Sequence, residues 1–310
     1  MNYYFAPMEG ITTYIFRRMH HKYFGGVDAY YTPFISPTMH GPFTPRERKD
    51  ILPENTKGVP TVPQILANNA EYFLEVTREL KDYGYKEVNL NLGCPSSRVA
   101  NKCKGSGFLG DTLRLEKFLD AIFEASVLPI SIKTRIGRFE EDEWEELIKM
   151  YNWYPVKELI IHPRVQMDLY KKPVHTDLFV QTYGDSSNPV CYNGDLYSVE
   201  DYQRILDHAP GISSVMLGRG ALTTPDLFEQ IQGNASKEKE RFWDFLEELF
   251  EAYYVELGNN ALYKMKELWI YMENSFSNVD KALKKIRKAK NEQEYRIAVK
   301  ELRETKGMLD

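Results

Sequence analysis

The chain has 310 residues, of which 43% are hydrophobic and 27% are charged, and its formal net charge is −5 at pH 7. This composition is typical of a globular protein, and the length suits one large domain with a smaller one. The negative net charge excludes a global attraction to nucleic acid, so any polyanion must be held by local basic patches. We find no apolar run of about 18 residues, as a membrane span needs, and no basic, apolar leader at the N-terminus.

Three cysteines, Cys94, Cys103 and Cys191, form no CxxC pair and no even framework. Such spacing predicts free thiols in a reducing, cytoplasmic setting. The gap between Cys94 and Cys103 also lacks the spacing of a zinc-ligand pair, so we expect no metal site.

Short β-rich segments alternate with longer amphipathic segments along most of the chain. The predicted strands are 3–8, 28–34, 61–66, 87–93, 129–137, 158–164, 189–195 and 214–220. The clearest helices between them are 69–85, 112–127 with Asp111 as N-cap, and 198–209 with Ser198 as N-cap. Strands that alternate with helices indicate parallel βαβ units, and eight such units make a (β/α)8 TIM barrel. An open doubly wound sheet is the alternative, but no GxGxxG follows the first strand.

The pattern changes near residue 235. The polar segment 232–240 is predicted to be a linker, and four helices are expected after it, at 241–257, 260–276, 279–289 and 291–304. We therefore expect a barrel domain over 1–235 and a small all-α helical bundle over 236–310.

Polar residues gather at the predicted strand ends, where TIM barrels place their active sites. They are Pro7, Met8 and Glu9, Pro33, Gln64, Asn91, Gly93 and Cys94, Lys133 and Arg135, His162 and Arg164, Asn193 and Gly194, and Gly218 and Arg219. Cys94 lies between a glycine and a proline, where the chain must turn, so its sulfur is presented rather than packed.

The last two strands end in "YNGD" (192–195) and "LGRG" (217–220). Glycines let backbone N–H groups approach a phosphate, and Arg219 adds positive charge. Together with Lys133 and His162, these ends favour a phosphorylated ring cofactor. The alternatives are glycines that only end strands, a solvated Lys133 and a core His162.

Six motifs, in order, resemble the tRNA-dihydrouridine synthases. They are "APMEGITTYIFR" (6–17), "NLGCP" (91–95), "IKTRIG" (132–137), "IHPR" (161–164), "YNGD" (192–195) and "LGRGAL" (217–222). The segment "KMKELWIYMENSF" (264–276) is similar to the second domain of that family. The "NxGCP" pattern is the most specific motif, since the others are shared loosely with other FMN barrels.

The resemblance implies an enzyme that uses FMN and NADPH, or NADH, to reduce the C5–C6 double bond of particular uridines in tRNA. Cys94 would be the general acid at C5, and hydride would reach C6 from the opposite face. Asn91 would contact the uracil. The flavin ring would be lined by Pro7, Met8, Gln64, Lys133 and His162, and its phosphate held by Asn193, Gly194, Gly218 and Arg219. A free thiol has a pKa of about 8.5, so it is mostly protonated near pH 7 and able to donate.

Two departures from the family pattern stand out. The sixth predicted strand ends in His162-Pro163-Arg164 where His-Gly-Arg is common, and Cys103 occupies a position where small residues are usual. We interpret Cys103 and Cys191 as structural.

Local basic clusters are the candidates for RNA contact. They are Arg98, Lys102 and Lys104 after Cys94, Arg164, Lys171 and Lys172 after the sixth strand, and the run 281–290, with Lys284, Lys285, Arg287 and Lys288. That run has six basic residues and no acidic one, and its alternative interpretation is a solvated helix face. No stable protein partner is inferred.

Three other functions stay open. The chain resembles, more distantly, FMN barrels that act on small molecules, of the dihydroorotate dehydrogenase or ene-reductase kind. It could also be a dihydrouridine synthase acting on ribosomal RNA, or a barrel that only binds RNA or protein. The helical tail disfavours the small-molecule enzyme, and the set of Cys94, Lys133 and His162 disfavours a binding protein without catalysis.

Overall fold

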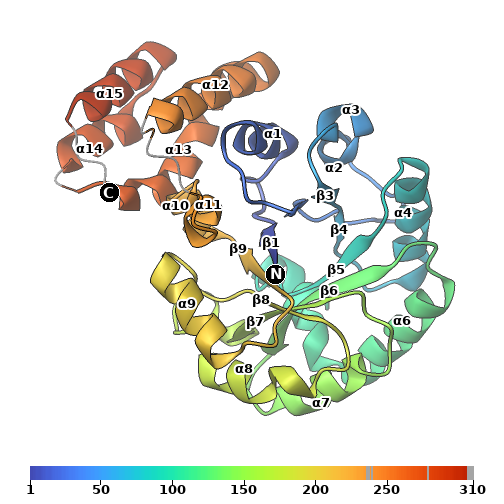
Figure 1. The fold of residues 1–310 in the computed structure, drawn as a ribbon. Helices are drawn as coiled ribbons and strands as arrows, with labels where there is room; N and C mark the ends of the chain where they lie inside the picture. Colours follow the sequence, from blue (N-terminus) through green and yellow to red (C-terminus); the bar gives the residue numbers. More distant parts are fainter. Residues whose placement is uncertain (235–237, 239, 278, 306–310) are drawn as a thin grey trace.

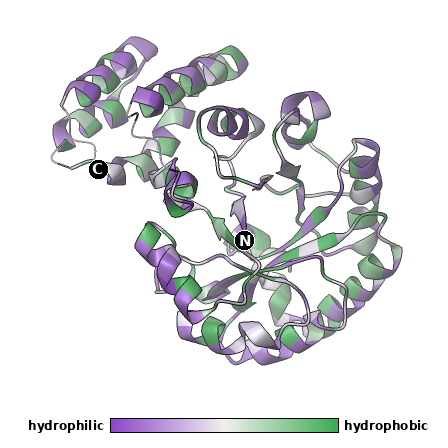
Figure 2. Ribbon diagram, viewed as in Figure 1, coloured by the Kyte–Doolittle hydropathy of each residue, from purple (hydrophilic) through white to green (hydrophobic). Residues whose placement is uncertain are grey.

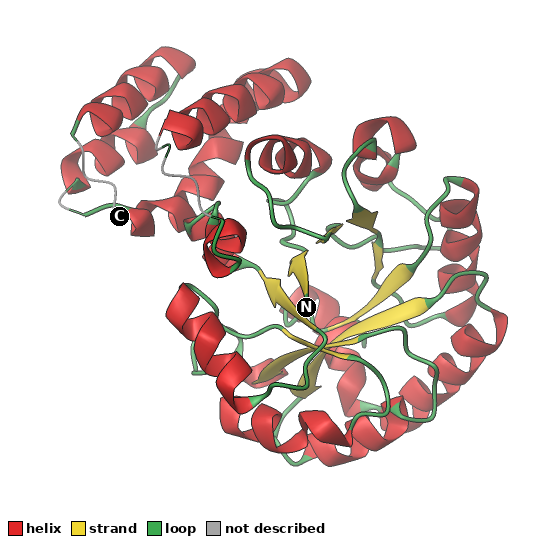
Figure 3. Cartoon of the chain, viewed as in Figure 1, coloured by secondary structure: helices red, strands yellow, loops and turns green. Residues whose placement is uncertain are grey.

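The computed structural model describes residues 1–234, 238, 240–277 and 279–305, and within them nine parallel strands form one sheet. The strands are β1 (Asn2–Phe5), β2 (Ala29–Tyr31), β3 (Thr61–Val62), β4 (Gln64–Ile65), β5 (Val88–Leu92), β6 (Ile130–Gly137), β7 (Leu159–Val165), β8 (Val190–Tyr192) and β9 (Ser214–Leu217). Their order is β3-β2-β1-β9-β8-β7-β6-β5-β4, so the sheet curls round until consecutive strands β3 and β4 form its two edges. The predicted TIM barrel is confirmed (Figures 1 and 3).

One predicted strand is divided in two. The segment 61–66 was expected as a single strand, but β3 pairs with β2 while β4 pairs with β5. Pro63 lies between them and has no N–H group for a ladder hydrogen bond. The strand therefore changes partner at Pro63, and this is where the barrel closes.

Helices surround the barrel, and some of them begin at a residue whose side chain caps the helix. They are α1 (Tyr14–Tyr23), α2 (Pro45–Ile51), α3 (Pro53–Thr56), α4 (Ala70–Asp82), α5 (Ser97–Ala100), α6 (Thr112–Ala125), α7 (Glu143–Tyr151), α8 (Thr176–Thr182), α9 (Val199–His208), α10 (Arg219–Thr223) and α11 (Leu227–Ile231). Both predicted N-caps are confirmed: Asp111 accepts from the Arg114 amide at 3.3 Å, and Ser198 accepts from the Asp201 amide at 3.1 Å.

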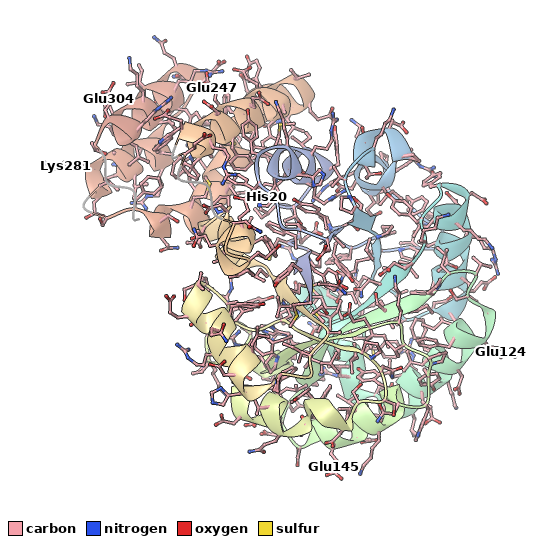
Figure 4. All side chains as sticks on the ribbon, in the orientation of Figure 1. His20, Glu124, Glu145, Glu247, Lys281 and Glu304 are labelled. Atoms are coloured by element: carbon pink, nitrogen blue, oxygen red, sulfur yellow. The ribbon has the colours of Figure 1, made fainter. Side chains whose placement is uncertain are left out.

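The four C-terminal helices are also confirmed, as α12 (Glu240–Leu257), α13 (Ala261–Met272), α14 (Asp280–Lys288) and α15 (Glu292–Glu304). The predicted domain boundary, between 235 and 236, falls outside the described residues. Helix α12 packs on α1, where Phe245 meets Phe16 and Phe24 edge to face. His20 lies at the same junction (Figure 4), and its ring is 6.5 Å from that of Phe245. Helices α14 and α15 lie at the outer end, away from the barrel (Figure 1).

Apolar residues form two separate buried clusters. The large one fills the space between strands and helices and continues into the helical region without a break. The small one lies apart from it and consists of Ala6, Ala29, Tyr31, Val62, Ile160, Cys191 and Met216. The strands are largely hydrophobic and the outer faces of the helices largely hydrophilic (Figure 2). Among the described helices, none combines the length and the apolar character that crossing a membrane requires.

The continuous core predicts that barrel and helical region unfold together. We expect Phe245→Ala, at a fully buried position, to lower the free energy of unfolding by about 3–5 kcal/mol in one cooperative transition. Val255→Ala is the control in the same helix, because Val255 is 87% exposed and such changes usually stay within about 0.5 kcal/mol. Urea unfolding followed by circular dichroism measures both. A separate early transition in Phe245→Ala would show that the two regions are independent.

Candidate active site

The turn that carries Cys94 is fixed from two sides. Strand β5 ends at Leu92, and the side-chain oxygen of Asn91 accepts hydrogen bonds from the backbone amides of Gly93 (3.0 Å) and Cys94 (2.9 Å). On the other side, Ser106 donates to the Cys94 carbonyl through its hydroxyl at 2.8 Å and through its amide at 3.1 Å. The backbone around the thiol is therefore held at both of its peptide groups.

The loop after Cys94 returns to pack on it only because of its glycines. Gly105 has φ +55°, and a Cβ at this position would lie 2.8 Å from the Cys94 carbonyl oxygen. A Cβ at Gly107 would lie 2.3 Å from the carbonyl oxygen of Ala100. These contacts were missed from the sequence, although the two glycines around Ser106, "GSG", were a usable signal of a tight loop.

The other two cysteines have structural surroundings. Cys103 has φ 53°, a left-handed conformation that favours glycine or asparagine. Its carbonyl accepts from Asn68 at 3.0 Å. Cys191 is fully buried in the small apolar cluster.

The surroundings of Cys94 keep its thiol protonated. Burial raises the pKa of the thiol, and the negative charge of Glu9 raises it further. A backbone hydrogen bond at Ser96 and the charges of Arg135 and Lys133 act in the opposite direction, but the pKa remains above its ordinary value. At neutral pH the group is a thiol rather than a thiolate, so it has a proton to give.

Lys133 is a half-buried cation beside the Cys94 turn. It lies on β6 directly beside Asn91 of β5 in the sheet register. Burial, with the charge of Arg135, lowers the pKa of Lys133 to about 8, so it stays mostly protonated at pH 7. No carboxylate among the described residues pairs with its ammonium group. An unpaired positive charge beside the Cys94 turn is suited to an anionic group of a ligand.

His162 is a neutral histidine with both ring nitrogens engaged. Its Nδ1 donates to the Asn193 carbonyl at 2.6 Å, which places the ring proton on Nδ1. Its Nε2 accepts from Arg164 at 3.2 Å. Burial and the charge of Arg135 hold the pKa of His162 well below its usual range.

Arg164 and Arg219 share one carboxylate. Arg164 donates to both oxygens of Asp195, at 3.0 and 2.6 Å, and Arg219 donates to one of them at 2.5 Å. Burial opposes ionisation of Asp195, but the hydrogen bonds from Arg164 and the charge of Arg219 hold its pKa below the usual value. Arg164 was predicted to contact substrate; here its side chain is 2% exposed and also donates to the Lys172 carbonyl.

The glycines of the predicted phosphate site have packing roles of their own. A Cβ at Gly194 would lie 2.0 Å from the Tyr192 hydroxyl, and one at Gly220 would lie 1.9 Å from the Leu196 carbonyl. A Cβ at Gly218 would come within 3.3 Å of Ala6. Asn193 donates to the Met216 carbonyl at 2.7 Å, which ties the end of β8 to β9. The assignment of these residues to a phosphate stays a prediction.

The remaining predicted lining residues come from β1 and β4. Pro7 and Met8 follow β1 and are half-buried, while Gln64 of β4 is fully buried. The Gln64 amide is hydrogen-bonded to Asn91 and Asn89, at 2.7 Å each. Among the described residues, no group of three histidine, cysteine or acidic side chains could hold a metal ion.

An arginine–aromatic rim after β7 and β8 was missed from the sequence. The Arg219 guanidinium lies 4.7 Å from the ring centre of Tyr170 and 5.7 Å from that of Tyr197. Arg135 lies 5.1 Å from the Tyr170 ring. Both tyrosines are exposed, at 52% and 40%. Leu169, with φ 52°, turns the chain just before Tyr170.

The predicted basic residues differ in whether a carboxylate pairs with their charge. Arg98 and Lys171 are exposed and form no ion pair within the described part of the chain. On α14, Lys285 pairs with Glu301 at 2.6 Å and Arg287 pairs with Glu273, whereas Lys284 and Lys288 have no such partner among the described residues. Lys281, on the same helix, lies at the outer edge of the helical region (Figure 4).

Solved structures of morphinone reductase share the fold. One covers 78% of this chain and 88% of its own length, with a TM-score of 0.53 and 11% identity. A mutant of morphinone reductase, solved in complex with tetrahydroNAD, covers 78% and 90%, with a TM-score of 0.50 and 12% identity. At this identity the likeness concerns the fold alone.

Curated relatives are similar over most of their length. A probable tRNA-dihydrouridine synthase of Staphylococcus epidermidis is 32% identical over 238 residues, which is 73% of this chain and 70% of the relative. One of Rhodobacter capsulatus is 28% identical over 256 residues, or 80% and 78%. The model of the family described as "Dihydrouridine synthase (Dus)" matches residues 4–310. The chain therefore belongs to the dihydrouridine synthase family.

Proposed function

We propose that this protein is a tRNA-dihydrouridine synthase, which reduces the C5–C6 double bond of a uridine in tRNA with Cys94 as the proton donor. One observation carries the proposal: the Cys94 turn, bonded at both peptide groups, presents a protonated thiol beside Lys133, with which no carboxylate among the described residues pairs. The names of the family and of its curated relatives support the same reaction. A tRNA substrate also agrees with the cytoplasmic setting expected from the free cysteines.

The residues at the strand ends fit a flavin, which we propose is FMN reduced by NADPH. A reduced flavin is anionic, and Lys133 offers it a half-buried positive charge that no carboxylate among the described residues neutralises. The Gln64 amide has a second N–H beside the one that it donates to Asn89, and such a donor suits the edge of a ring. Both ring nitrogens of His162 are engaged within the protein, so we propose that His162 contributes its neutral ring surface. Bound there, reduced FMN would supply the hydride that C6 of the uracil accepts. This fit rests on the chemistry of the donor set.

The chain's own contribution to the chemistry is the proton. As hydride reaches C6, negative charge develops at C5, and the S–H bond of Cys94 breaks to form the new C5–H bond. The thiolate left behind is stabilised by the positive charges of Arg135 and Lys133, the charges that lower the pKa of this thiol. A raised pKa in the resting enzyme and two nearby cations suit a group that first holds and then releases a proton. Reprotonation from solvent completes the cycle.

RNA is proposed to reach the site across the loops at the barrel mouth. A base in a folded RNA must leave its stack to enter the site, at a cost of a few kcal/mol. Exposed tyrosines paired with arginines, such as Tyr170 and Tyr197 around Arg219, can stack with unpaired bases. Arg98, Lys171, Lys284 and Lys288 form no ion pair with the described residues, so we propose that their charges bind phosphates.

Replacing Cys94 separates the two halves of the reaction. We expect Cys94→Ala to bind FMN and to be reduced by NADPH as the unmodified enzyme is. Oxidation of the reduced flavin by unmodified tRNA should slow by about 10²–10⁴-fold, the usual contribution of a general acid. Cys94→Ser should be nearly as slow, because a hydroxyl is a far weaker acid. Single-turnover absorbance of the flavin measures each rate, with Cys103→Ala as the active control. Oxidation of Cys94→Ala at the unmodified rate would remove Cys94 from this role.

Lys133 is expected to make flavin binding pH-dependent. The free enzyme loses the Lys133 proton as the pH rises through about 8, so its affinity for FMN should fall above that pH. Lys133→Met should bind FMN weakly at pH 7 and show no such fall, while the exposed control Lys171→Met behaves as the unmodified protein. Quenching of flavin fluorescence in a titration gives the dissociation constants. A Lys133→Met variant with unmodified affinity would contradict the proposed flavin site.

The salt dependence of RNA binding tests the basic residues. We expect Arg98→Glu with Lys171→Glu, and separately Lys284→Glu with Lys288→Glu, to reduce the slope of log affinity against log salt by roughly one unit per lost phosphate contact. Reduction of the flavin by NADPH should stay unchanged. Lys149→Glu, on the outer helix α7, is the control, because Lys149 is exposed and pairs with Glu145 at 2.6 Å. If a double variant keeps the salt slope of the unmodified protein, its two residues lie on a solvated surface and do not contact RNA.

A further inference from the structure

We propose that Asn89 and Ser131 are positioning residues for proton transfer, because a head-to-tail chain of buried side chains fixes the amide of Asn91 and thereby the Cys94 turn. This inference rests on the proposed function. Neither residue bonds to Cys94 itself; they act through Gln64 and Asn91.

These hydrogen bonds all run in one direction, from the Cys94 turn into the barrel. The Asn91 side chain accepts from the turn and donates to the Gln64 oxygen at 2.7 Å. Gln64 in turn donates to the oxygen of Asn89 at 2.7 Å, and Asn89 donates to the hydroxyl of Ser131 at 2.9 Å. Ser131 donates onward to the Val88 carbonyl at 3.4 Å. Each side chain accepts from the turn side and donates away from it.

The sheet register assembles this chain. Gln64 of β4 and Ser131 of β6 both lie directly opposite Asn89 of β5, so one polar row crosses three adjacent strands. Successive strand residues face opposite sides, and Leu90 belongs to the large cluster between strands and helices. Asn89 and Asn91 therefore share the other face, inside the barrel. Gln64, Asn89 and Ser131 are fully buried, so no solvent can replace a lost partner without cost.

A side-chain amide has a donor end and an acceptor end, so a row of hydrogen-bonded amides can fix which end of Asn91 faces the turn. Without the Asn89 oxygen, the Gln64 amide would lose the acceptor for its NH₂ group and could turn over. Its NH₂ would then face the NH₂ of Asn91, which would have to turn as well. A turned Asn91 would point donor hydrogens at the backbone amides of Gly93 and Cys94, which are donors themselves. Ser131, whose own proton goes to the Val88 carbonyl, offers Asn89 an acceptor and so favours the direction of the amides that holds the turn.

The expected effect is large on one half-reaction only. Misplacing a reacting group by about 1 Å can cost about 10²-fold in rate. Asn89→Leu and the milder Ser131→Ala should therefore slow the oxidation of reduced flavin by tRNA, by up to about 10²-fold for Asn89→Leu. Reduction of the flavin by NADPH should slow far less, since most of the lost hydrogen bonds serve the turn that presents the acid, and of these side chains only Gln64 is proposed to line the flavin.

A rescue variant and a matched control distinguish a positioning role of Asn89 from a general effect on folding. Asn89→Asp keeps an oxygen for Gln64 and can accept from the Ser131 hydroxyl, so it should restore most of the rate lost in Asn89→Leu. Thr77→Val removes a fully buried hydroxyl in α4, outside the barrel, and should leave both half-reactions unchanged. Equal slowing of both half-reactions in Asn89→Leu, or an unmodified rate of oxidation, would overturn the proposal.

A second readout does not depend on RNA. In a Cys103→Ala background, alkylation of Cys94 by iodoacetamide at fixed pH should be severalfold faster in Ser131→Ala and Asn89→Leu, because a freed turn exposes the thiol. An unchanged rate of alkylation would overturn the positioning role. If tRNA fails to oxidise the unmodified enzyme while alkylation responds as expected, the proposed function fails and the chain of amides stands.

Discussion

The site depends on the pair of hydrogen bonds that the Asn91 side chain accepts from the backbone of Gly93 and Cys94. These bonds turn the chain sharply at the end of β5 and hold the thiol where burial keeps it protonated. Gly105 and Ser106 close the turn from the opposite side, since only a glycine fits against the Cys94 carbonyl. A proton donor must be both protonated and fixed in place, and one turn meets the two requirements.

Around this turn the cations have different tasks. Lys133 has no carboxylate partner among the described residues, so its charge is available to a ligand. Arg135 ties the Gly93 carbonyl to the loop after β7 through the carbonyls of Val165 and Leu169. Arg164 and Arg219 share Asp195, which neutralises part of their charge and joins three strand ends. At the same barrel mouth, Lys133 is thus available to bind a ligand, whereas Arg135, Arg164 and Arg219 form bonds that hold the loops in place.

Local sequence patterns predicted what is local in the structure. Strand periodicity, the caps at Asp111 and Ser198 and the four C-terminal helices followed from neighbouring residues, and the glycine and proline around Cys94 identified the turn. What the sequence did not reveal are contacts between distant segments: the return of Ser106 to Cys94, the amide row through Asn89, the rim at Tyr170, and the glutamates that pair with Lys285 and Arg287 of α14. Pro63 was visible, but the change of strand partner at this proline depends on where the barrel closes.

The central claim is that Cys94 holds its proton until a substrate takes it. The most direct test is the pKa of this thiol, obtained from the pH dependence of its alkylation in a protein with Cys103→Ala. We predict a pKa above the ordinary value of about 8.5, because burial outweighs the neighbouring cations. A pKa below about 7 would mean that Cys94 is a thiolate at neutral pH, and such a group could not serve as the acid.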